Sequence, residues 1–294
     1  MAAILSSPLR SLAALTGLRI VSTALNLPGP AACARLHAMG ATVDKVEPPE
    51  GDPLERYAPG WYRRLHAGIP QHRIDLKRDE GRETMRTLLD NADVLVTAQR
   101  PAALARIGLD RASLAAHPRL CHVAILGHPP PDEDLPGHDL TYLAMCGLVR
   151  PPRMPPTLFA DMAGAERVAS AALALVYERL QSGRGGHAIV ALADVAHDLA
   201  SPLREGLTAP TGLLGGGLAG YNLYATAEGW IALAALEPRF FQHLAELLGL
   251  TPATQDKLAA KFAERTAREW EQWARANDLP LVAVHSPLHE KAFP

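Results

Sequence analysis

The sequence predicts an α/β protein with a doubly wound, Rossmann-like large domain and a smaller α+β domain. The first observation is that short apolar segments alternate with helical segments along residues 1–200, as in βαβ proteins with a mostly parallel sheet. The second is that this alternation then gives way to a hairpin followed by helices. The third is a length of 294 residues with 48% hydrophobic residues, which is enough for a large and a small domain.

Five strand-like segments and two helical segments carry the alternation in the first half of the chain. The strand-like segments are LRIVSTAL at 18–25, ATVDKVEPP at 41–49, HRIDLK at 72–77, DVLVTA at 93–98 and RLCHVAIL at 119–126. The helical segments are PGPAACARLHAMG at 28–40, with proline early and glycine late, and EGRETMRTLLDNA at 80–92. Together they predict one sheet with helices on both faces.

A longer helix is predicted to begin near Asp161. Apolar residues recur there at spacings of three and four, which is typical of one helix face. They are Met162, Ala165, Val168, Ala169, Ala172, Leu173 and Val176. The glycine-rich SGRGG at 182–186 is expected to end this helix.

The change of pattern after residue 200 predicts a second domain. Residues 201–220 are rich in glycine and proline and are expected to form a linker after a large domain at 1–200. The smaller domain, 221–278, is expected to contain a β-hairpin, YNLYATAEGWIALAAL, followed by helices over 239–278. We expect the last segment, 279–294, to return towards the large domain.

Composition excludes several classes of function. Lys plus Arg total 29 against 31 for Asp plus Glu, so no strongly basic face for nucleic acid is expected. The three cysteines, Cys33, Cys121 and Cys146, form no C-x-x-C pair, which indicates reduced thiols of a cytoplasmic protein and no metal site. No apolar run approaches the ~20 residues that cross a bilayer, and the N-terminus does not resemble a signal peptide.

The segment GGGLAG at 215–220 matches the spacing G-x-G-x-x-G. A dinucleotide site would need a strand before this motif and a helix after it. Here the glycine- and proline-rich linker precedes it and a strand-like segment follows. We therefore expect a close-packed loop and no nucleotide site.

Three residues could carry acid–base chemistry, and each also has an ordinary structural interpretation. Asp161 could cap its helix, or its carboxylate could act beside backbone N–H groups able to hold an oxyanion. His138 could be a solvated loop residue or, kept neutral by a helix N-terminus, a proton acceptor. The neighbouring Asp139 is expected to cap a short helix closed by Gly147. Glu237 follows an apolar strand and locally resembles any exposed carboxylate.

The order of several motifs resembles the family III CoA-transferases (CaiB/BaiF superfamily), and within them the α-methylacyl-CoA racemases. LTGLRIVSTALNLPGPAACARLHAMGATVDKVEPPEGD resembles the opening strand, G-P helix and second strand of the family. IDLKRDEGRETMRTLLDNADVLV is similar to its L-D-L-K segment, and RPAALARIGLDRASLAAHPRL to its R-P-G-x-x-x-x-L-G-L…N-P-x-L stretch. SGRGGHAIVALAD is similar to T-G-x-G-Q-x-V-x-x-S-x-x-D.

The resemblance implies catalytic roles for three residues. In the racemases of the family, G-H-D-x-x-Y-L-A contains a catalytic histidine, L-A-D-x-A-G a carboxylate, and x-E-P-x-F a glutamate that supports the histidine. His138, Asp161 and Glu237 match these positions. One base would remove the α-proton of a thioester and an acid opposite would return it. We expect the enolate oxygen to lie against backbone N–H groups at the start of the Asp161 helix.

The chain departs from the family where coenzyme A would bind. The family's basic loop N-R-x-K-R-S is replaced by HAGIPQ at 66–71, which contains no lysine or arginine. Arg100 keeps the first position of R-P-G, and Arg63 and Arg64 lie a few residues before the altered loop. These three arginines are therefore the candidate coenzyme A anchors, with Arg100 as the main one.

The leading hypothesis is an acyl-CoA racemase or epimerase acting on a 2-methyl-branched acyl-CoA, with the thioester as substrate and no tightly bound cofactor. The first alternative is a CoA-transferase that forms an anhydride at Asp161. The second is an inactive structural relative with an eroded coenzyme A site. The resemblance also implies an interlocked homodimer with the active site between the large domain of one chain and the small domain of the other.

Overall fold

A six-stranded sheet organises the first part of the chain. The computed structural model describes residues 13–285, and the chain divides into two units between Ala200 and Ser201. The sheet consists of β1 (Arg19–Ser22), β2 (Thr42–Glu47), β3 (Gln71–Arg73), β4 (Val94–Thr97), β5 (Cys121–Leu126) and β6 (His187–Ala191). The strand order is β3-β2-β1-β4-β5-β6 and every pair is parallel. This is a doubly wound order with its switch between β1 and β4, which confirms the predicted fold class for this unit.

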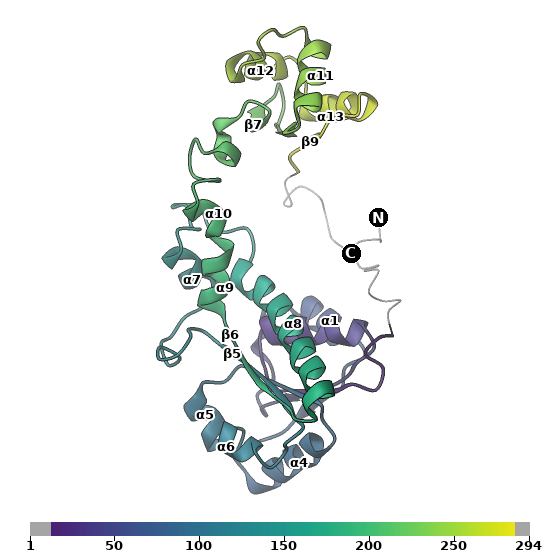
Figure 1. Cartoon of the computed structure of the whole chain (residues 1–294), viewed down its shortest axis with the longest axis vertical. Helices are drawn as coiled ribbons and strands as arrows, with labels where there is room; N and C mark the ends of the chain where they lie inside the picture. Colours follow the sequence, from purple (N-terminus) through teal and green to yellow (C-terminus); the bar gives the residue numbers. More distant parts are fainter. Residues whose placement is uncertain (1–12, 286–294) are drawn as a thin grey trace. The chain divides into compact units, whose positions relative to one another are not determined.

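Helices cover both faces of this sheet (Figure 1). On one face lie α1 (Pro28–Ala38) and α8 (Phe159–Ser182), and on the other α4 (Asp79–Asp90), α5 (Pro101–Arg106) and α6 (Arg111–Leu114). All four residues of β4 are buried. A central parallel strand is expected to be uniformly apolar because side chains on both of its faces enter a core. Val94 and Val96 belong to the α1–α8 core and Leu95 to the opposite one.

Four more short helices belong to this unit, in the segments that follow β2, β5 and β6. They are α2 (Pro53–Tyr57), α3 (Pro59–Leu65), α7 (Asp139–Met145) and α9 (Leu192–Leu199). Gly183 ends α8 with a positive φ of 72°, a conformation that suits glycine, so the predicted helix stop is confirmed.

A buried ion pair fixes the chain beyond β1 and β2. Lys45 on β2 is 2% exposed, and its Nζ lies 2.8 Å from Asp52 Oδ2. Asp52 also accepts the backbone N–H groups of Asn26 and Leu54, each at 2.9 Å from Oδ1. This carboxylate therefore joins β2, the loop after β1 and the start of α2. Tyr62 of α3 donates to Glu47 at 2.6 Å beside it, and burial raises the pKa of the Tyr62 hydroxyl.

The second unit contains a three-stranded antiparallel sheet in the order β7-β8-β9. Its strands are β7 (Tyr221–Ala225), β8 (Trp230–Ala234) and β9 (Leu281–Ala283), and its helices are α11 (Pro238–Leu248), α12 (Gln255–Phe262) and α13 (Ala267–Ala276). Their apolar faces meet around Ile231, Phe262 and Trp270. The expected hairpin and the helices that follow it are therefore present. β9 pairs with β8, and residues 286–294 of the predicted returning segment lie outside the described residues.

The segment predicted as a linker has regular structure of its own. Residues 201–220 begin with the short helix α10 (Ser201–Arg204) and contain a turn at Leu213–Gly217, in which Gly215 and Gly216 depart from helical backbone angles. Gly216 takes a positive φ of 102° within that turn. Strand β7 follows GGGLAG, so the order of elements is not that of a dinucleotide-binding motif. Between residues 13 and 285, no helix is both long and apolar enough to span a bilayer.

Candidate active site

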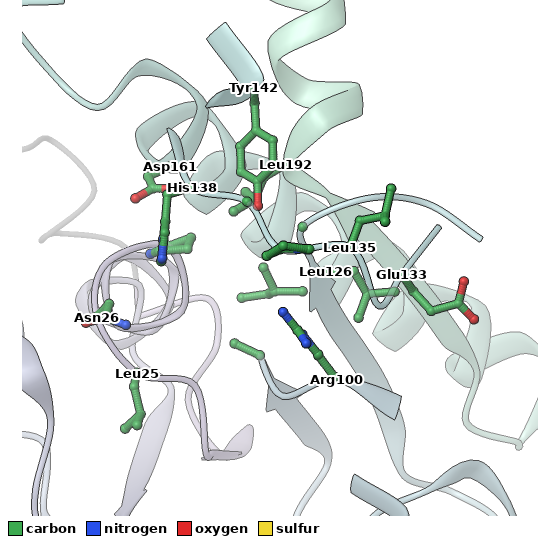
Figure 2. Close-up of a pocket in the computed structure, with 16 residues that line it drawn as sticks. Leu25, Asn26, Arg100, Leu126, Glu133, Leu135, His138, Tyr142, Asp161 and Leu192 are labelled. Atoms are coloured by element: carbon green, nitrogen blue, oxygen red, sulfur yellow. The ribbon is translucent and has the colours of Figure 1, made fainter. Parts of the chain in front are cut away.

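A cavity of about 320 Å³ lies at the carboxyl ends of β1, β4 and β5 (Figure 2). This is the switch point of the sheet, where doubly wound proteins bind their ligands. Its polar lining consists of Asn26, Arg100, Glu133, His138, Tyr142 and Asp161. Apolar side chains such as Leu126 and Leu192 complete the wall. The structure thus brings His138, Asp161 and Arg100, three of the predicted site residues, to one cavity.

His138 stands at the N-terminus of α7 and its side chain is exposed. Its backbone N–H donates to the Thr141 hydroxyl oxygen at 3.0 Å, and the Thr141 hydroxyl donates to the His138 carbonyl at 2.7 Å. Residue 138 therefore occupies the N-cap position, and the prediction that Asp139 caps this helix is wrong. The side chain of His138 also belongs to the lining of the 320 Å³ cavity.

Asp139 is instead buried, with 4% exposure, and binds the start of α8. The backbone N–H of Asp161 donates to Asp139 Oδ1 at 3.0 Å. Asp161 is the third residue of α8 and the N-cap is Leu158, which makes no side-chain cap hydrogen bond. The interpretation of Asp161 as a helix cap is therefore wrong. The Asp161 N–H itself is not open to an enolate oxygen, because Asp139 already accepts that hydrogen. The expectation for the other N–H groups at the start of α8 stays a prediction.

The Asp161 carboxyl is poised between its protonated and ionised forms. Burial, and secondly the negative charge of Asp139, raises the pKa of Asp161 to about 7. A carboxyl group with a pKa near neutrality can both give and take a proton at physiological pH. The pKa of Asp139 is also raised by burial, while hydrogen bonds from the start of α8 oppose this shift.

Asp161→Asn is expected to stabilise the protein at pH 8 and to lose this advantage as the pH falls towards 4. The folded pKa of about 7 lies above the ordinary value of 3.8, so the folded state binds more protons than the unfolded state between these values. Wild-type stability should therefore decrease as the pH rises through this window, whereas asparagine has no charge to bury. Thermal unfolding of both proteins across this range measures the difference. A pH-independent difference would contradict the raised pKa.

The candidate coenzyme A anchors are not placed alike. Arg100 precedes α5 and lines the 320 Å³ cavity. Arg63 and Arg64 have exposed side chains on α3. They do not line this cavity, nor the second cavity described below.

A second cavity, of about 400 Å³, is bordered by Leu25, which also borders the first. Its charged lining mixes two cationic side chains, Lys77 and Arg106, with the carboxylates of Glu47, Glu50 and Asp75. Only the two cationic side chains could pair with the phosphates of a nucleotide. The sequence analysis did not single out Lys77 or Arg106, although both lie within the segments that carried the family resemblance.

Glu237 belongs to the second unit, where it stands at the N-cap of α11. Its carbonyl accepts the N–H groups of Phe240 and Phe241 at 3.0 and 3.2 Å. These are backbone contacts that hold the start of the helix. The support of His138 by the Glu237 carboxylate stays a prediction.

The sequence matches the model of CoA-transferase family III over residues 15–291. The chain belongs to this family. It is 29% identical to the alpha-methylacyl-CoA racemase of Mus musculus, over 94% of this chain and 80% of that protein. It is 28% identical to the succinate–glutarate CoA-transferase of Agrobacterium fabrum, over 87% of this chain and 72% of that protein. Family III relatives of this chain therefore include a racemase and a transferase at similar identity.

Solved structures agree with the family assignment. The crystal structure of Rv3272 from Mycobacterium tuberculosis covers 92% of this chain, and the chain covers 83% of it, with a TM-score of 0.82 and 26% identity. A CAIB/BAIF family protein from Brucella suis shares the fold, with a TM-score of 0.77 over 92% of this chain and 84% of that one. The parallel six-stranded sheet is thus that of a family III CoA-transferase, and the substrate chemistry of the family is that of CoA thioesters.

Proposed function

We propose that this family III protein is an acyl-CoA racemase or epimerase that inverts the α-carbon of a 2-methylacyl-CoA. The observation that carries the proposal is the pairing of His138 with Asp161 on the wall of one cavity, Asp161 having a pKa of about 7. Inversion requires two proton-transfer groups on opposite faces of one carbon. An imidazole beside a carboxyl group with a pKa of about 7 meets this requirement.

The proposed reaction needs no redox change and no second substrate. With Asp161 protonated, neutral His138 removes the α-proton, and the electron pair of the C–H bond moves into the thioester as an enolate. Asp161 then gives its proton to the opposite face of the α-carbon. The product has the inverted configuration, with His138 protonated and Asp161 ionised, and proton exchange with water restores the starting forms. Glu237 would stabilise the protonated His138.

A CoA-transferase reaction at Asp161 is the second candidate, favoured by the similarity to the succinate–glutarate enzyme. There, the ionised Asp161 would attack the thioester carbonyl and displace the CoA thiolate. The chemistry needs an acceptor carboxylic acid and leaves the cavity's histidine without a role. His138 is therefore the residue that favours proton transfer over acyl transfer.

The experiment that tests the proposal follows the α-proton in heavy water. Purified protein is incubated with each enantiomer of 2-methyldecanoyl-CoA in D₂O without any acceptor acid, and deuterium at the α-carbon is measured by mass spectrometry. A racemase incorporates deuterium and yields both enantiomers. Acyl exchange onto an added carboxylic acid, without α-deuteration, would establish the transferase instead.

Arg100→Ala is expected to weaken coenzyme A binding by about tenfold or more. A charge-assisted hydrogen bond contributes about 1.5–3 kcal/mol, and 1.4 kcal/mol corresponds to a factor of ten. Because the basic loop of the family is missing, we expect wild-type dissociation constants nearer millimolar than micromolar. Calorimetry at low salt measures the dissociation constants of wild type and of Arg100→Ala. The variants Arg106→Ala and Arg63→Ala locate the phosphates: weakening by Arg63→Ala alone would place them beside α3 and not in the second cavity.

The proposed assembly is the homodimer that the family resemblance implies. Support of His138 by the Glu237 carboxylate is part of this proposal. The proposed compartment is the cytoplasm.

A further inference from the structure

The ring of Tyr142 is held in a fixed position beside the catalytic pair. Tyr142 lies on α7, one turn after His138, and is 2% exposed. Two glycines make room for it: a Cβ at Gly137 would lie 2.4 Å from Tyr142 Cε1, and one at Gly127 would lie 2.6 Å from the Tyr142 hydroxyl. The ring of His128 meets it edge-on, with centroids 5.3 Å apart. The loop between β5 and α7 is therefore built around this side chain.

The hydroxyl at the end of this ring has no hydrogen-bond partner among the described residues, although it lines the cavity (Figure 2). The residue as a whole is buried, but its hydroxyl is not among the fully buried atoms that lack a partner, so a molecule in the cavity can reach it. Burial, as the largest cause, raises the pKa of Tyr142, so its O–H keeps the proton at physiological pH. The side chain therefore offers one fixed, uncommitted donor to whatever occupies the cavity.

The proposed reaction needs such a donor. Removing the α-proton moves negative charge onto the thioester oxygen, and donors placed in advance at that oxygen usually make the largest contribution to catalysis. The Asp161 N–H cannot serve, because Asp139 accepts its hydrogen at 3.0 Å. Arg100, also in the cavity wall, is the candidate anchor of the coenzyme A part.

We propose that the Tyr142 hydroxyl donates a hydrogen bond to the thioester carbonyl oxygen of the bound acyl-CoA and is a catalytic residue that stabilises the enolate. The proton stays on the tyrosine, so the transfer between the α-carbon, His138 and Asp161 is unchanged. This role rests on the proposed racemase function. It differs from that of His138 and Asp161 because it acts on the oxygen and is the same for both enantiomers.

The test is Tyr142→Phe, which removes one oxygen and keeps the ring between Gly127 and Gly137. Removing one donor to an oxyanion lowers rates by about 10²–10³-fold, and we expect a loss of this size in α-deuterium incorporation for both enantiomers. Tyr177→Phe is the matched control, since Tyr177 lies on α8 in the same unit and is 66% exposed. Unfolding temperatures within one degree of wild type would show that the fold is kept.

A binding measurement separates this proposal from the proposed function. 2-Methyldecanoyl-CoA is compared with its thioether, in which a CH₂ replaces the carbonyl. Tyr142→Phe should weaken the binding of the thioester and leave that of the thioether unchanged. The difference in affinity between the two ligands should therefore be smaller in the variant than in wild type. If wild type exchanges α-protons and Tyr142→Phe is equally fast, the tyrosine role is wrong and the racemase stands. If wild type exchanges none but the ligand-specific loss is found, the racemase is wrong and the hydrogen bond stands. Absence of thioester binding, or equal losses for both ligands, overturns the tyrosine role.

Discussion

His138→Ala should slow α-deuterium exchange by about 10²–10⁴-fold for one enantiomer of a 2-methylacyl-CoA, and Asp161→Ala for the other. Each variant removes the base on one face of the α-carbon and leaves the base on the opposite face. The remaining base can still remove a proton from the enantiomer presented to it, so that enantiomer should keep much of its exchange. Racemisation needs both groups and should be lost in both variants. Single-turnover exchange in D₂O, followed by chiral separation, measures all four rates.

One control for this experiment comes from the surface of the first unit and one from the second unit. Tyr177→Phe should leave both rates unchanged, because Tyr177 is 66% exposed outside the cavity lining. Glu237→Gln should resemble a weakened His138→Ala and affect the same enantiomer, if Glu237 supports the imidazole. Undiminished exchange of both enantiomers in both alanine variants would disprove the two-base mechanism. Loss for both enantiomers in Asp161→Ala alone would point to chemistry that depends only on the carboxylate.

Lys45→Met should lower the free energy of unfolding by about 3–5 kcal/mol, the usual cost of leaving one partner of a buried ion pair without the other. Lys45 and Asp52 have side chains that are 2% and 0% exposed, with 2.8 Å between Nζ and Oδ2. Methionine keeps much of the packing volume but leaves the buried Asp52 carboxylate with only its N–H donors. Urea unfolding followed by circular dichroism measures the change.

Arg73→Met is the matched control for Lys45→Met. Arg73 pairs with Glu55 at 2.9 Å, but the two side chains are 55% and 45% exposed. Pairs of this kind contribute about 0.2–1 kcal/mol, because water screens the charges. Equal losses in both variants would show that the buried pair contributes no more than an exposed one. A further expectation is that Lys45→Met loosens the loop at Asn26, which lines the 320 Å³ cavity.

The alternation of apolar strands and helices was sufficient to predict the parallel sheet, because a central strand that is buried on both faces, such as β4, is mostly apolar. The edge strand β6 was missed for the opposite physical reason. His187 and Ile189 are exposed on it, so HAIVA lacks the uniform apolar character of a central strand. The short helix α10 was not predicted, because a helix of four residues is too short to show a periodic pattern of apolar residues.

The sequence was a better guide to which residues line the cavity than to the hydrogen bonds that they make. The resemblance to the motifs of the family pointed to His138 and Asp161, which line the same cavity. It could not show that Asp139 accepts the Asp161 N–H, since these residues are 22 positions apart and only the packing of α7 against α8 brings them together. Lys77 and Arg106 were missed because a cationic residue at the rim of a cavity looks, in sequence, like any surface charge.

The hydrogen bond between the Asp161 N–H and Asp139 means that the two adjacent residues of the G-H-D motif have different roles. Asp139 is needed for packing, whereas the side chain of His138 is available for chemistry. His138 is exposed and contacts Thr141 of α7 through its backbone groups, so replacing its side chain should disturb the scaffold less than replacing Asp139. Asp139 is buried, and replacing it would strip α8 of an interaction at its first turn. An attempt to re-engineer this protein into a transferase could therefore vary residue 138 freely while leaving residue 139 untouched. Of these two consecutive residues, His138 faces the cavity and Asp139 holds the start of α8.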